Sequence, residues 1–62
     1  MKVAVINEER TNKRHVRLVP KNEMPLNELE EKAEAWIKEN GSLFYYIILD
    51  KEICEEVETI YI

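Results

Sequence analysis

The chain has 62 residues, a formal net charge of −4 at pH 7 and a single cysteine, Cys54. A domain of this size buries only about 60% of the surface that its unfolded chain exposes, so one core leaves little stability to spare. An intrachain disulfide is excluded, and one cysteine with one histidine does not favour a zinc site. No apolar run approaches the roughly 20 residues of a membrane-spanning helix. We therefore expect one small cytoplasmic domain, residues 1–62, that gains stability by association.

The first third of the chain predicts a β-hairpin. Residues 2–7, KVAVIN, form a short run rich in β-branched side chains, which favours a strand. Residues 14–19, RHVRLV, predict a second strand in which Val16 and Leu18 point inward. The intervening EERTNK is polar, and Asn12 is its best turn residue.

A helix is predicted over residues 27–40. Asn27 and Glu30 fit a capping box of the form N-x-x-E, and Asn40-Gly41 provides a C-terminal stop. Apolar residues fall within an arc of about 100°, the width of a stripe that faces a core. These residues are Leu26, Leu29, Ala33, Trp36 and Ile37. We expect the stripe to pack on the sheet with Trp36 buried.

The last third predicts two further strands. Residues 43–49, LFYYIIL, combine aromatic and β-branched side chains, which favours a strand. The tail is ambiguous. Its closing VETIYI is typical of a strand, but four residues match helical spacing: Ile53, Val57, Ile60 and Tyr61. We choose a strand over 55–61, joined to the preceding one by a hairpin loop. The predicted fold class is α+β: a ββαββ chain with a small antiparallel sheet of two hairpins and one helix packed on one face.

Both faces of LFYYIIL are apolar, and one helix covers only one face of a sheet. A loop over 50–54 sets Leu49 opposite Glu55 and Ile47 opposite Val57. The residues expected under the helix are then Leu43, Tyr45, Ile47, Val57, Thr59 and Tyr61. The residues expected on the open face, as a partner-binding surface, are Phe44, Tyr46, Ile48, Glu56, Glu58 and Ile60, with His15 and Arg17 beside them. A slip of one residue would exchange which residues of the last strand lie beneath the helix.

The stretch RTNKRHVR, residues 10–17, supports two interpretations. Its cations Arg10, Lys13, Arg14 and Arg17 could neutralise phosphates of a nucleic acid, or they could solvate an edge hairpin and discourage edge-to-edge pairing. Residues 1–22 carry six Lys/Arg against two Glu, whereas residues 23–62 carry three Lys against eleven Asp/Glu. Such an acidic body repels a polyanion within a Debye length of about 10 Å. Nucleic-acid binding is therefore the alternative, and not the leading, hypothesis.

The acidic surplus also supports two interpretations, ordinary solubility or a negative surface that attracts a basic protein partner. The glutamates concerned are Glu28, Glu30, Glu31, Glu34, Glu39, Glu52, Glu55, Glu56 and Glu58.

No catalytic signature is present. His15 and Cys54 would need hydrogen-bond reach, an orienting third group and an oxyanion donor, and no motif supplies them. We expect no enzyme activity, no cofactor, no metal and no small-molecule substrate. The leading hypothesis is a small acidic protein-protein interaction module, an inhibitor or adaptor, that binds a protein partner or forms a homodimer. In style, though on no motif, it is similar to inhibitors that phages and mobile elements encode.

Overall fold

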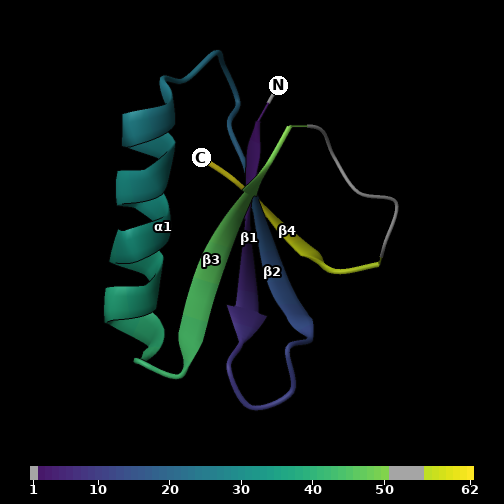
Figure 1. Ribbon diagram of the computed structural model, residues 1–62. Helices are drawn as coiled ribbons and strands as arrows, with labels where there is room; N and C mark the ends of the chain where they lie inside the picture. The colour runs from purple at the N-terminus through teal and green to yellow at the C-terminus, as the bar shows by residue number, and fades with distance from the viewer. Residues whose placement is uncertain (1, 51–55) are drawn as a thin grey trace.

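The computed structural model describes residues 2–50 and 56–62. These residues form four strands and one helix in the predicted order, and the α+β class is confirmed (Figure 1). The elements are β1 (Val3–Glu8), β2 (Arg14–Val19), α1 (Leu26–Asn40), β3 (Phe44–Leu49) and β4 (Glu58–Tyr61). The tail is a strand, although a shorter one than the predicted 55–61.

The strands form one sheet in the order β3-β1-β2-β4. β1 pairs antiparallel with both β2 and β3, whereas β4 pairs parallel with β2. The predicted hairpin between the third and fourth strands is therefore wrong, because these strands lie at opposite edges of a mixed sheet. Ile47 consequently does not face Val57, and Glu55 lies outside the described residues.

The central position of β1 has a clear cause in its sequence. Val3, Ala4, Val5 and Ile6 are all 0% exposed, because β1 has a strand on either side and apolar side chains on both faces. β2 and β3 both run antiparallel to β1 and are therefore parallel to each other. Parallel strands need a crossover connection, which α1 provides by carrying the chain across the sheet to the far side of β1.

The helix begins one residue earlier than predicted, at Leu26. Its N-cap is Pro25, and no side chain caps it, so the predicted capping box of Asn27 and Glu30 does not form. Asn27 already lies inside the first turn. The predicted stop is confirmed, since the N–H of Gly41 donates to the carbonyl of Ile37 at 2.8 Å.

The main core lies between α1 and the sheet. Its buried residues, the helix-side cluster, are Ala4, Ile6, Val16, Leu18, Leu29 and Ala33. Figure 1 shows α1 alongside the β3 half of the sheet, and most of its contacts are with β1 and β3. The predicted stripe is confirmed at Leu29 and Ala33, but Trp36 is half-buried and Leu26 is 43% exposed. A second cluster of Val3, Val5 and Val19 lies on the other face of the sheet.

The predicted assignment of the two sheet faces is wrong. On β3, the side chains of Phe44, Tyr46 and Ile48 pack against the helix-side cluster, and Ile60 of β4 does the same. The residues of β3 that face away from the helix are Tyr45, Ile47 and Leu49, and those of β4 are Thr59 and Tyr61. Leu43, predicted to lie under the helix, is 61% exposed. The predicted register depends on a hairpin loop between the third and fourth strands, and these strands do not pair.

A β-bulge sets the position of His15. Ile6 lies opposite Val16 and Asn7 opposite Arg14, which leaves His15 as the extra residue of β2. Its ring packs on the helix side, so the predicted place of His15 on the open face is wrong. Val16 and Leu18 point toward the helix as predicted, and Arg17 lies on the opposite face, also as predicted.

Candidate functional site

β3 forms one edge of the sheet and lacks the residue types and bulges that usually protect an edge strand. Natural edges carry charges, proline or bulges that prevent pairing with another chain. The six residues of β3, FYYIIL, include no charge, no proline and no glycine, and their register with β1 has no shift. The opposite edge, β4, is shorter and begins with Glu58. The edge of β3 is therefore the part of the described sheet best suited to pair with another strand.

The hydrogen bonds to β1 show which backbone groups of β3 point outward. The N–H of Glu9 donates to the carbonyl of Leu43 at 2.9 Å, which continues the register that sets Glu8 opposite Phe44. In an antiparallel pair, hydrogen-bonded and non-bonded residue pairs alternate. Tyr45, Ile47 and Leu49 therefore bond to β1 in the same way as Leu43. The N–H and C=O groups of Phe44, Tyr46 and Ile48 point to the free edge.

Two carboxylates, those of Glu30 and Glu34, lie beside Tyr46 near this edge. The Tyr46 hydroxyl lies 3.3 Å from Oε1 of Glu34 and 3.4 Å from Oε2 of Glu30 on α1, so one proton is shared between two carboxylates. Burial of the hydroxyl, and then the charges of Glu30 and Glu34, raise the pKa of Tyr46 above its ordinary 10.0. Within the described residues the ion pair present is Lys2–Asp50, at 3.1 Å, so neither glutamate is paired with a cation.

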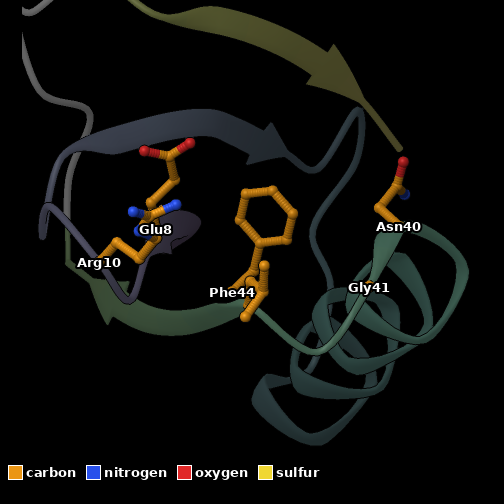
Figure 2. Close-up of a pocket in the computed structure, with 6 residues that line it drawn as sticks. Glu8, Arg10, Asn40, Gly41 and Phe44 are labelled. Carbon is orange, nitrogen blue, oxygen red and sulfur yellow. The ribbon is translucent and has the colours of Figure 1, made fainter.

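An aromatic group lies at the start of β3. The ring of Phe44 is 5.1 Å from that of Trp36 in an edge-to-face arrangement and 4.9 Å from that of His15. Beside it lies a cavity of about 210 Å³. Its lining residues are Glu8, Arg10, Asn40, Gly41, Leu43 and Phe44, and Figure 2 shows the ring of Phe44 between Glu8 and Asn40. The strand edge thus ends at an opening with both apolar and charged walls.

The structure does not bring the predicted partner-binding residues together. Phe44, Tyr46 and Ile48 lie on one edge strand, whereas Glu58 and Ile60 lie on the other, with β1 and β2 between them. Glu56 is exposed and precedes β4. From the sequence, Glu30 is assigned to a capping box and both Glu30 and Glu34 to the acidic surplus, and neither is placed beside the third strand. Their i, i+4 spacing on one flank of the apolar stripe is the signal that places them beside a single strand.

The basic residues of 10–17 are divided between the two sides of the sheet. Arg17 donates from Nε to Oγ1 of Thr59 at 3.1 Å on the face away from the helix, where Arg14 lies opposite Asn7. Arg10 instead lines the cavity on the helix side, and Lys13 is exposed in the turn. The four cations therefore do not follow one continuous stripe.

The turn between β1 and β2 is the predicted one. Asn12 adopts a left-handed conformation with φ of 58°, which asparagine tolerates better than most residues. Its Oδ1 accepts a hydrogen bond from the hydroxyl of Tyr45 at 2.9 Å, which ties the tip of the hairpin to β3.

No group of three or more His, Cys, Asp or Glu residues within 2–50 and 56–62 is arranged to hold a metal ion. Cys54 lies outside the described residues, so the expectation that it forms no catalytic pair with His15 stays a prediction. A helix long and apolar enough to cross a membrane is not found in the part of the chain that the structure describes.

No family model, no curated protein and no solved structure matches this chain.

Proposed function

We propose that this chain is a small protein-interaction module that binds an extended segment of a partner protein as a fifth strand along the free edge of β3. The observation that carries the proposal is the outward direction of the backbone N–H and C=O groups of Phe44, Tyr46 and Ile48. In strand addition of this kind, main-chain hydrogen bonds provide affinity and the alternating side chains provide specificity. An inhibitor or an adaptor would use such an edge to hold a segment of its target.

The side chains around the edge support the same proposal. Tyr45 and Tyr46 lie on opposite faces of β3 and are both half-buried, so each offers an apolar ring with a polar end to an added strand. Tyrosine and tryptophan are enriched among the residues that contribute most to protein binding. Trp36 and Phe44 extend this aromatic surface to the cavity at the start of β3.

The test is a backbone modification, because the proposal concerns backbone groups. We would synthesise the chain with an N-methyl group on the amide of Tyr46, which removes one outward donor and blocks the edge while keeping the side chain. The matched control carries the N-methyl group on Tyr45, whose amide faces β1. The probe is a short peptide of alternating valine and threonine with a lysine at its centre.

The expected result is that the peptide slows hydrogen exchange at the amides of Phe44, Tyr46 and Ile48 in the unmodified chain. N-methylation of Tyr46 leaves the fold intact and abolishes this protection at the remaining two amides. N-methylation of Tyr45 lowers the melting temperature instead, because it removes a hydrogen bond to β1. Peptide binding that survives N-methylation of Tyr46, or an absence of protection at all three amides in the unmodified chain, would overturn the proposal.

A further inference from the structure

A strand added to β3 brings one of its residues next to Tyr46, and this inference rests on the proposed function. In an antiparallel pair, residues directly opposite each other project their side chains from the same face, with Cβ atoms about 4.5–5.5 Å apart. The partner residue opposite Tyr46 would therefore lie on the helix side of the sheet, since Tyr46 packs against the helix-side cluster. There it meets the carboxylates of Glu30 and Glu34.

Among the described residues, the charged groups around the Tyr46 hydroxyl are all negative. Both carboxylates lie within 3.4 Å of the Tyr46 hydroxyl, and no cation among residues 2–50 and 56–62 forms an ion pair with either of them. Glu30 is half-buried, so its charge is screened less than that of a fully exposed group. We infer that the edge of β3 selects an extended partner segment carrying a lysine or arginine directly opposite Tyr46. The long side chain of either residue spans the distance from the added strand to the two carboxylates.

The carboxylates of Glu30 and Glu34 also disfavour a second copy of this chain as the strand that pairs with the edge of β3. Two copies could pair β3 with β3 about a two-fold axis, with Tyr46 opposite its counterpart and Phe44 opposite Ile48. That arrangement satisfies the outward backbone groups but sets two Glu30–Glu34 pairs beside the axis on one face of the sheet. Like charges brought close together repel, and each chain carries a net charge of −4. A basic segment of another protein removes this repulsion.

The first experiment compares three peptides that differ only at the central residue. Each alternates valine and threonine, and the centre is lysine, norleucine or glutamate. Norleucine keeps the length of the lysine side chain without its charge. At low salt we expect the lysine peptide to bind about fivefold more tightly than the norleucine peptide, with the glutamate peptide weakest. The difference should shrink as salt is added, because the carboxylates are partly exposed.

The second experiment identifies the responsible carboxylates. The double variant Glu30→Gln, Glu34→Gln should bring the lysine and norleucine peptides within about twofold of each other. The matched control is Glu28→Gln, Glu39→Gln, which removes the same charge from exposed positions of α1 that form no hydrogen bond with Tyr46. This control should keep most of the preference, which separates a local effect from a change in net charge.

The outcomes distinguish this inference from the proposed function. If all three peptides protect the amides of Phe44, Tyr46 and Ile48 with equal affinity, the strand-addition function holds and the charge selection is wrong. If none of them protects those amides, the proposed function fails and the selection fails with it. Protection that appears without peptide and grows with protein concentration would show that a second copy occupies the edge, and would overturn the inference.

Discussion

The hydroxyl of Tyr46 lies 3.3 Å from Oε1 of Glu34, so the edge strand β3 and the helix that packs on one face of the sheet meet at a titratable contact. Burial, and then the charges of Glu30 and Glu34, raise the pKa of Tyr46 above 10.0. A raised pKa means that folding favours the neutral hydroxyl. Its contribution to stability is therefore fully present below pH 10.0 and is lost as the pH rises through the pKa of the folded state.

We therefore predict that Tyr46→Phe makes the alkaline loss of stability shallower. The measurement is urea denaturation of both proteins from neutral pH to well above pH 10.0, together with the absorbance of tyrosinate. In the folded chain Tyr46 should ionise above pH 10.0. Equal alkaline slopes for the two proteins would contradict this prediction.

Gly41 follows α1 with φ of 118° and ψ of 158°, a conformation that is open almost only to glycine. A Cβ atom added here would meet nothing within 4 Å, so substitution costs backbone strain alone. We expect Gly41→Ala to lower the free energy of unfolding by about 1–3 kcal/mol. Ser42→Ala, at the exposed neighbouring position, should stay within about 0.5 kcal/mol. A melting curve for Gly41→Ala equal to that of the parent would show that another backbone conformation is available.

Asn7 is 5% exposed, and its Oδ1 accepts no hydrogen bond from any described group. A buried polar atom left unsatisfied costs about 1–3 kcal/mol. Asn7 shares its face of the sheet with Val3 and Val5, so Asn7→Val should raise the free energy of unfolding by about 1 kcal/mol. Asn7→Asp should lower it, because a carboxylate is costlier to bury. Destabilisation by valine in chemical denaturation would argue that the amide has a partner in solution.

Sequence reasoning treats Arg10 and Arg14 alike, as exposed cations of one hairpin. The structure distinguishes them, since Arg10 is exposed whereas Arg14 is half-buried and its Nη1 is buried. We expect Arg10→Gln to change the free energy of unfolding by less than about 0.5 kcal/mol. Arg14→Gln should lower it by more than about 1 kcal/mol, because the packing of a long side chain is lost as well as its charge. Equal effects in guanidinium denaturation would refute the distinction.

Trp36 contacts Phe44 and His15 at the exposed end of the core. Truncation of a fully buried tryptophan costs about 3–5 kcal/mol, and because Trp36 is half-buried we expect Trp36→Ala to cost about 2–3 kcal/mol. Trp36→Phe should recover more than half of this loss by keeping an aromatic contact. An unchanged midpoint of denaturation in Trp36→Ala would show that the indole contributes nothing to the core.

Local patterns in the sequence determined the elements of this fold. The β-branched run at residues 2–7, the apolar stripe of the helix and the stop at Gly41 each act through interactions within a few residues, so they can be identified without knowing the fold. The same is true of the inward direction of Val16 and Leu18, which follows from simple alternation. Phe44, Tyr46 and Ile48 were also named correctly as residues on one face of an apolar strand.

Only the tertiary structure decided which strands pair. β3 lies against β1, and β4 lies against β2, because the crossover through α1 places β3 beside the central strand, whose two faces are both buried. That pairing determines which face of β3 meets the helix, which backbone groups remain at the edge, and that Tyr46 meets Glu30 and Glu34. These contacts join residues 12 or 16 positions apart. The alternation of residues along β3 is the same whichever strand it pairs with and whichever of its faces meets the helix. No pattern in the sequence alone could therefore distinguish these arrangements.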